Sequence, residues 1–481
     1  MHHEATLFLW TGLLLAGSVL LALAAARLSV PFLVIFLGLG MLLGADGLQV
    51  MSLPDVEVVR TVGVAALALI LFEGGMSTSF RRLRTVARAA ILLSTIGVIV
   101  TAVGAGLLTY WLFGWTWLES FLLGAVISST DAAAIFATLR QTRIRRFTAR
   151  VLEAESGLND PMAIALTIGL ITWLLHPEKG PAAFLGLLAA QLGLGLIVGL
   201  VAGWITMKIF ARIPSSIGSF APVASLATCA ISYGLADWVG GSGFMAVYLV
   251  GLAIGSTPSR YRGQLTIFHE GVAFLSQILL FVILGLFVVP HDLLKVAIPS
   301  IVLSLGLVLI VRPLAVWAAT GSLRISQKER LLLSWAGLKG AVPIVFAAIV
   351  LASGVERGSL IFDVVFFVVI FSTLVQGTTL TWLASRLGLV EPPDMPVGQT
   401  PLSRPAQFSM TIQASHAISG VMLHEIGLPP WARIARVVRG SGKRQLKANM
   451  VLEPGDTIVV TYPPTLQPEL DDVVSRWRRR I

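Results

Sequence analysis

Hydrophobic residues in this 481-residue chain gather in long runs instead of alternating with polar ones. A run of about 20 apolar residues is long enough to cross the hydrocarbon core of a membrane as a helix. The pattern predicts thirteen spans, at residues 6–26, 28–44, 58–75, 89–112, 118–139, 151–175, 183–210, 220–238, 243–257, 266–289, 296–320, 330–351 and 359–385. We therefore expect an all-α polytopic membrane protein over most of the chain.

Composition agrees with this pattern, because 56% of the residues are hydrophobic, only 12% are charged and the mean hydropathy is +0.86. Soluble domains carry about 25% charged residues. The first run ends in Ala24–Ala26, as a signal peptide would, but MHHE at its start lacks the positive charge that a signal sequence requires. We interpret this run as the first spanning helix.

The basic residues divide unevenly between the two sets of loops that these spans create. Eighteen lie on one side, namely Arg27, Arg81, Arg82, Arg84, Arg88, Arg140, Arg143, Arg145, Arg146, Arg150, Lys208, Arg212, Arg260, Arg262, Arg324, Lys328, Arg330 and Arg386, whereas four lie on the other, namely Arg60, Lys179, Lys295 and Arg357. Lysine and arginine accumulate in cytoplasmic loops, so the N-terminus is predicted outside and the C-terminus in the cytoplasm of a bacterial inner membrane. The net charge of +10 then reflects topology and contact with membrane lipids, and no nucleic acid is expected as a partner.

The sixth span, which begins near residue 151, contains unexpected carboxylates. Asp160 lies about 15 Å along this helix, near the middle of the bilayer. Ser156 shares its face, and Glu155 and Asn159 form a neighbouring pair. A carboxylate at that depth is costly and normally lines an ion or proton path. The alternatives are a carboxylate buried for helix packing and, for Glu155, a mere ion-pair partner; Glu153, nearer the interface, is expected to be solvated.

The fifth span contains SSTDAAA at residues 128–134, with Thr130 and Asp131 in the middle of the membrane. Three successive hydroxyl side chains compete with helical hydrogen bonds. This pattern favours an unwound segment whose carbonyl groups and carboxylate coordinate a cation. The alternative is an unbroken helix in which serine and threonine bond to their own backbone.

The twelfth span, SWAGLKGAVPIVFA at residues 334–347, is interrupted by Gly337, Gly340 and Pro343. Spans 1–6 and 8–13 run in opposite senses, so the fifth and twelfth spans occupy corresponding places in two inverted repeats. Paired broken helices of this kind are typical of secondary transporters, and channels do not need them. Arg312, inside the eleventh span, is a permanent cation that must find a carboxylate.

Several of these motifs together resemble those of the NhaP-type cation/proton antiporters, relatives of the eukaryotic sodium/proton exchangers. The motifs are TD at 130–131, ESGLNDP at 155–161, RP at 312–313 and GLKGAV at 337–342, and the resemblance covers roughly residues 5–385. It implies a thirteen-helix homodimer with a mobile core domain beside a dimerisation domain.

The resemblance also assigns roles to individual residues. It implies that Asp160 binds the monovalent cation or the proton, with help from Asp131, Thr130, Ser156 and Asn159. It further implies that Glu155 pairs with Arg312, and that Glu73, in LFEGG at the inner end of the third span, assists the site or caps the interface. Lys339 stands where many exchangers have arginine, and its role stays open.

The composition changes after residue 388. A linker at 389–403 precedes residues 404–481, where QFSMTIQ, ARIARVV and DTIVVTY alternate like strands and EPGD at 453–456 suits a type II turn. A small cytoplasmic α+β domain is expected. MVLEPGDTIVV resembles the C-terminal lobe of potassium-transport regulatory domains of the RCK type. The tail lacks a Gly-x-Gly-x-x-Gly motif, so another small-molecule or nucleotide ligand, or a purely structural role, remains open.

These observations predict a secondary active antiporter that exchanges potassium, or sodium, for a proton in equal numbers and serves pH and cation homeostasis. No catalysed reaction and no cofactor are expected. Alternatives are a sodium-selective antiporter, a cation channel, and an intramembrane aspartyl protease. The protease is disfavoured because Asp160 follows Asn159 in GLND, not a Gly-x-Gly-Asp sequence.

Overall fold

A computed structural model describes residues 32–44, 47–49, 55–131, 144–212, 220–257, 261–390, 406–423, 425–429, 432–439, 442–444, 450–462 and 467–478, with isolated positions between 9 and 20. The chain divides into two compact units, residues 1–391 and 392–481. We refer to these as the membrane unit and the tail unit.

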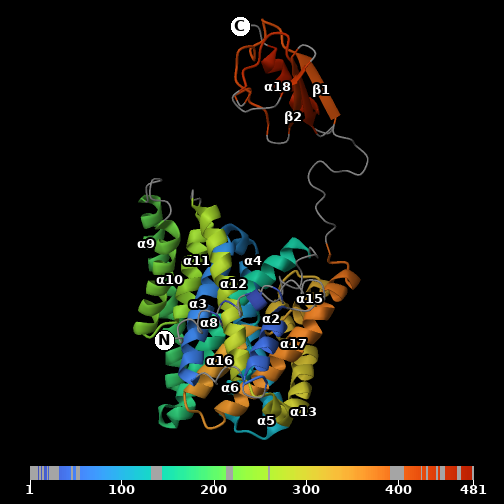
Figure 1. The fold of residues 1–481 in the computed structure, drawn as a ribbon. Coiled ribbons are helices and arrows are strands. Elements are labelled where there is room, and N and C mark those ends of the chain that lie inside the picture. The colour runs from blue at the N-terminus through green and yellow to red at the C-terminus, as the bar shows by residue number, and fades with distance from the viewer. Residues whose placement is uncertain are drawn as a thin grey trace. The chain divides into compact units, whose positions relative to one another are not determined.

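The described part of the membrane unit is helical (Figure 1). Its helices are α2 (Phe32–Leu43), α3 (Val56–Ser77), α4 (Phe80–Leu92), α5 (Val98–Phe113), α6 (Trp117–Val126), α8 (Arg146–Leu175), α9 (Gly180–Arg212), α10 (Ala221–Trp238), α11 (Gly243–Ser256), α12 (Arg262–Phe287), α13 (Pro290–Gly306), α14 (Arg312–Thr320), α15 (Gln327–Trp335), α16 (Ala341–Ala352) and α17 (Gly358–Arg386). In the described segments, six continuous helical stretches are both long and apolar enough to cross a membrane: 83–113, 147–175, 177–212, 262–287, 290–320 and 358–386.

Each predicted span from 28–44 onward overlaps one of these helices or a consecutive group of them. The first span, 6–26, lies outside the described residues apart from isolated positions, as does the second half of the fifth. The fourth and eleventh spans begin earlier than predicted, with α4 and α13, and each joins two helices through a π-helical turn, η1 (Leu93–Gly97) and η4 (Leu307–Val311). Helix α4 therefore begins at Phe80, within the arginine-rich segment that the hydropathy pattern assigned to a loop.

The fifth and twelfth spans are both interrupted. Helix α6 ends at Val126, and residues 127–131 that follow it are not helical. Helix α15 ends at Trp335, and α16 begins at Ala341 with Gly340 as its N-cap residue. Pro343 was expected to interrupt this span, but it lies in the first turn of α16, where a missing N–H costs no helical hydrogen bond. We refer to residues 127–131 and 336–340 as the first and second breaks.

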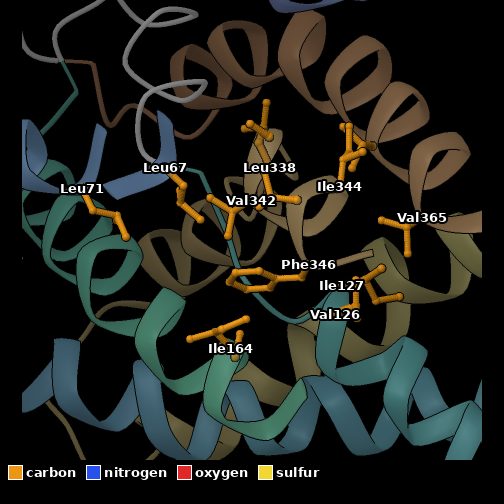
Figure 2. Close-up of a cluster of buried hydrophobic side chains, with 14 of the residues drawn as sticks. Leu67, Leu71, Val126, Ile127, Ile164, Leu338, Val342, Ile344, Phe346 and Val365 are labelled. Atoms are coloured by element: carbon orange, nitrogen blue, oxygen red, sulfur yellow. The ribbon is translucent and has the colours of Figure 1, made fainter. Parts of the chain in front are cut away.

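Apolar side chains surround the two breaks. Figure 2 labels ten of them, contributed by α3, α6, α8, α16, α17 and the breaks themselves: Leu67, Leu71, Val126, Ile127, Ile164, Leu338, Val342, Ile344, Phe346 and Val365. Phe346 is fully buried and lies near the middle of this group. The unwound backbone is therefore enclosed by protein, the environment that irregular backbone at membrane depth requires.

The first halves of the two broken spans begin in the same way. Helices α6 and α15 each start with a capping box, whose glutamates Glu119 and Glu329 are both only 6% exposed. Arg357 Nε donates to Glu119 Oε1 at 3.0 Å, and Arg145 Nη1 lies 3.3 Å from Glu329 Oε1. Arg145 follows the first broken span but pairs with the start of the second, and Arg357 follows the second but pairs with the start of the first. These ion pairs therefore join the two halves of the membrane unit.

The start of α8 is also tied to the end of the membrane unit. Ile144 and Val390 form an antiparallel β-bridge, and the backbone N–H of Arg145 donates to the carbonyl of Leu389 at 2.8 Å. Helix α8 carries Asp160 and its neighbours. The start of this helix is therefore fixed by residues that follow α17.

The tail unit contains a four-stranded antiparallel sheet and one helix. The strands are β1 (Ala406–Thr411), β2 (Arg433–Arg439), β3 (Gly442–Arg444) and β4 (Thr457–Tyr462), in the order β1-β4-β2-β3, and the helix is α18 (Gln467–Trp477). At the predicted turn, Gly455 has φ of 95° and Asp456 N–H donates to the Glu453 carbonyl at 3.0 Å, as a type II turn requires.

One buried carboxylate anchors the turn of the tail unit. Asp456 is fully buried and accepts two hydrogen bonds, both of 2.7 Å, from Arg439. These bonds raise the pKa of the Arg439 guanidinium above its ordinary value. Arg439 therefore stays charged at any physiological pH, and its two bonds to Asp456 anchor the turn.

Candidate functional site

Helix α8 brings three polar side chains to the first break. Asp160 is 4% exposed and Asn159 is fully buried, in the middle of a 30-residue helix. Asn159 Nδ2 donates to Thr130 Oγ1 at 2.6 Å, and Ser156 Oγ lies 3.2 Å from the same oxygen. The predicted residues Thr130, Ser156, Asn159 and Asp160 thus occur together, where the first break contacts α8.

Two acceptor oxygens that α8 brings to this contact have no hydrogen-bond partner within the described residues. They are Asp160 Oδ1 and Asn159 Oδ1, and both are buried. Buried acceptors are normally satisfied. The contact between α8 and the first break therefore leaves buried acceptors that the described residues do not satisfy.

Asp131 joins the first break to the second. Its backbone N–H donates to the Leu338 carbonyl at 2.9 Å. Its carboxylate lies so close to Gly340 that a Cβ at position 340 would overlap it. The close approach of Asp131 therefore requires glycine at position 340. From the sequence, Gly340 was expected only to interrupt the helix.

Lys339 lies between the two breaks and is 1% exposed. Its ammonium donates to the carbonyls of Ser129 at 2.8 Å and Ser128 at 3.3 Å. These are the carbonyl groups that the unwound segment was expected to offer to a cation. In this structure a lysine ammonium occupies the position beside these two carbonyls.

Glu155 and Arg312 form a buried ion pair on the other side of the second break. Arg312 Nη2 donates to Glu155 Oε1 at 2.6 Å, and the two side chains are only 4% and 1% exposed. A Cβ on Gly337 would lie 2.5 Å from Arg312 Nε, so this glycine makes room for the guanidinium. Arg312 follows the π-helical turn η4 directly, an irregularity that is frequent at functional sites.

These charges form one electrostatic group. Asp131 and Lys339 act on Asp160, and Arg312 and Glu155 act on Lys339. With all five ionised, three carboxylates and two cations leave a net charge of −1 (−3 plus +2). One proton or one monovalent cation neutralises this group, whereas two would leave it positive.

Glu73 lies apart from this group. It accepts a hydrogen bond of 2.6 Å from Ser77 at the C-terminal end of α3, and its charge interacts with those of Glu153 and Glu270. No described contact joins it to Asp160. Glu153 was expected to be solvated, but it is half-buried and accepts from Thr78 at 2.8 Å, because α3 packs against the start of α8.

The sequence reasoning missed three polar residues on α17. Ser372, Thr373 and Gln376 are at most 2% exposed and contact the second break. Their signal was present in the sequence as STLVQ, a polar cluster in the middle of a strongly apolar span.

Comparison with known proteins decides the family. The model of the family described as "Sodium/hydrogen exchanger, transmembrane" matches residues 13–386. The chain belongs to this family. This exchanger is therefore an integral membrane protein, and the match spans both breaks, α8 and α17.

Named relatives of this exchanger include potassium/proton antiporters. It is 36% identical to the K(+)/H(+) antiporter NhaP2 of Shewanella sp. (strain MR-4) over 94% of this chain and 80% of that protein. It is 35% identical to the K(+)/H(+) antiporter NhaP of Alkalimonas amylolytica over 96% of this chain and 82% of that protein. The low-affinity Na(+)/H(+) antiporter NhaS1 of Synechocystis sp. (strain ATCC 27184 / PCC 6803 / Kazusa) is 27% identical over 75% of this chain and 70% of that protein.

A solved structure shares the fold. The sodium proton antiporter MjNhaP1 from Methanocaldococcus jannaschii superposes with a TM-score of 0.71 over 80% of this chain and 99% of its own. The two sequences are 23% identical, so this likeness concerns the fold alone.

Proposed function

We propose that this exchanger moves a monovalent cation and a proton in opposite directions across the membrane, with potassium preferred and sodium as the alternative. The family match and the names of the two relatives that align along nearly the whole chain support this choice. The observation that carries it is the site itself, where a buried carboxylate with an unpartnered oxygen lies between two broken helices.

One carboxylate serves both occupants in this proposal. Protonated Asp160 is neutral and does not attract a cation, whereas ionised Asp160 binds the cation and disfavours the proton. The proton and the cation therefore displace each other. The electrostatic group of five charged residues is neutral only when one of them is bound. Lys339 donates hydrogen bonds to two carbonyl groups of the first break. These carbonyls therefore keep a partner while the proton and the cation exchange at Asp160.

Proteoliposomes with a pH-sensitive dye inside test the function. A potassium gradient, and more weakly a sodium gradient, should drive proton movement in the opposite direction, whereas a choline gradient should not. Proton movement that is indifferent to both cations would contradict the proposal. Cation flux without proton movement would instead make the protein a channel.

We further propose a homodimer with thirteen spans in two inverted halves, its N-terminus outside and its C-terminus in the cytoplasm of a bacterial inner membrane. The uneven distribution of basic residues supports the orientation, and the ion pairs that join the start of each broken span to the segment following the other support two inverted halves. Labelling of single cysteines placed at Lys179 and Lys328 with a membrane-impermeant reagent tests the orientation. Only the first should react from outside.

The charge count predicts the stoichiometry. If one proton is traded for one monovalent cation, a transport cycle moves no net charge, and a potential worth about 2.3 kcal/mol per charge per 100 mV does no work on it. We therefore expect the rate and end-point of exchange to be unchanged when a chloride gradient and a chloride-selective ionophore impose a potential. A shift of the end-point with potential would show that unequal charges move.

We propose that residues 404–481 form a regulatory domain related to the C-terminal lobe of RCK domains, with residues 389–403 as its linker to the transport domain at 1–388. The tail unit has a hydrophobic core of its own. A potassium/proton antiporter relative also aligns along 94% of this chain, and both observations support a module with its own role. Removal of residues 391–481 retains the Ile144–Val390 bridge. The truncated protein should still exchange, with a changed dependence on pH or ligand; an unchanged profile would make the tail purely structural.

A further inference from the structure

Helix α17 carries a buried polar stripe in an otherwise apolar span. Ser372, Thr373 and Gln376 are 2%, 2% and 1% exposed in a helix long and apolar enough to cross the membrane. Polar side chains in such helices cost free energy and persist where they satisfy other buried groups. None of the three contacts Asp160 or Asp131 through a described hydrogen bond, so the ion-binding chemistry above does not account for them.

The stripe holds the second break through a chain of hydrogen bonds. The backbone N–H of Lys339 donates to Ser372 Oγ at 2.9 Å, and Ser372 Oγ donates to Gln376 Oε1 at 2.5 Å. Gln376 Nε2 then donates to the Trp335 carbonyl at 2.7 Å, at the last residue of α15. The chain thus runs from the end of α15, through α17, to Lys339.

A fourth bond fixes Lys339 from its other side. Thr373 Oγ1 donates to the carbonyl of Lys339 at 3.1 Å, so both backbone groups of this residue are bound by α17. The break has no helical ladder to fix its dihedral angles, and α17 supplies the missing partners. The position of the Lys339 Cα is therefore determined by α17.

The position of Lys339 matters at the ion site. Its ammonium binds the carbonyls of Ser128 and Ser129, directly before Thr130, and its charge acts on Asp160. A shift of the Lys339 backbone therefore moves a positive charge relative to the carboxylate and loosens the first break at the same time. Both changes alter how well the site binds a cation.

We propose that Ser372 and Gln376 are positioning residues of the exchanger, which set its apparent affinity for the transported cation by fixing Lys339. Neither residue touches the cation. The proposal rests on the proposed function, because it concerns the affinity of that same site.

Kinetics in proteoliposomes containing the full-length protein test this proposal. The initial rate of proton movement is measured against potassium concentration for the wild type, Ser372→Ala, Gln376→Leu and Ser372→Thr. We expect Ser372→Ala and Gln376→Leu each to raise the half-saturating potassium concentration about tenfold, the effect of one buried hydrogen-bonding group left unpaired. Ser372→Thr retains the hydroxyl and should restore a value near that of the wild type.

A matched control lies two residues beyond Gln376. Thr378 is also on α17, but it is exposed and its hydroxyl bonds only to carbonyls of its own helix. Thr378→Val should leave the half-saturating concentration unchanged. The double variant Ser372→Ala/Gln376→Leu should be no worse than the poorer single variant, because both changes interrupt one chain of bonds.

A half-saturating concentration that stays at the wild-type value, with only less folded protein or a lower maximal rate, would overturn the proposal and make the stripe a packing feature. If these two substituted proteins do not fold, the milder Thr373→Val, which removes only the bond to the Lys339 carbonyl, is tested instead. Its half-saturating potassium concentration should rise, and an unchanged value would overturn the proposal. A wild-type protein without cation-dependent proton movement would refute the proposed function itself, which is a separate and recognisable result.

Discussion

Asp160→Asn is expected to abolish cation/proton exchange in proteoliposomes while the protein still folds. The amide has nearly the shape of the carboxylate, and the side chain is only 4% exposed, so packing around α8 is retained. An amide neither ionises nor carries the proton, so the site loses both of its occupants. With asparagine at position 160, the electrostatic group carries no net charge when empty, and a bound cation would make it positive.

The measurement is the initial rate of proton movement driven by potassium or sodium, with the amount of folded protein determined by size-exclusion chromatography. Asp292→Asn is the control, because Asp292 pairs with Lys295 at an exposed position outside the site. This variant should exchange like the wild type. Appreciable cation-driven proton movement in Asp160→Asn would show that another group carries the proton.

Arg312→Ala is expected to reduce the amount of folded protein sharply. Arg312 and Glu155 are nearly inaccessible to solvent and 2.6 Å apart, so the substitution leaves an uncompensated carboxylate inside the membrane unit. Removing one partner of a buried ion pair costs about 3–5 kcal/mol. The thermal unfolding temperature in detergent should fall accordingly.

The double variant Glu155→Ala/Arg312→Ala separates loss of the pair from loss of each residue. It should recover part of the stability, because no charge is then left unpaired. Arg60→Ala is the matched control, since it removes an exposed pair with Glu57 and should change stability by less than about 1 kcal/mol. If the double variant is as unstable as the sum of the two single variants, the two charges do not stabilise each other.

Hydropathy sufficed to place Asp160 in the middle of a spanning helix, because the cost of a charge in a membrane makes each carboxylate conspicuous in an apolar run. The same reasoning predicted non-helical backbone at Thr130 and a break between α15 and α16. Both features depend on local sequence. Hydroxyl side chains compete with the helical backbone, and Gly340 adopts a conformation that is not helical.

Contacts between the breaks were beyond such reasoning. That Gly340 makes room for the Asp131 carboxylate, and that Lys339 binds the carbonyls of Ser128 and Ser129, depends on how two spans far apart in the chain cross. Hydropathy along one span contains no information about that crossing. The start of α4 was misjudged for a related reason, because arginines in a helix that extends beyond the bilayer look like a loop. The RCK-type assignment of the tail remains a resemblance.

The bridge between Ile144 and Val390 also bears on how the protein is made. A ribosome synthesises residue 390 long after residue 144, so the start of α8 has no partner at this position while the whole second half of the chain is being inserted. Arg145 likewise awaits Glu329 of α15. A nascent chain that stops before Leu389 thus lacks the contacts that anchor the start of the helix that carries Asp160, and the proposed ion site gains this support only after α17 has been synthesised.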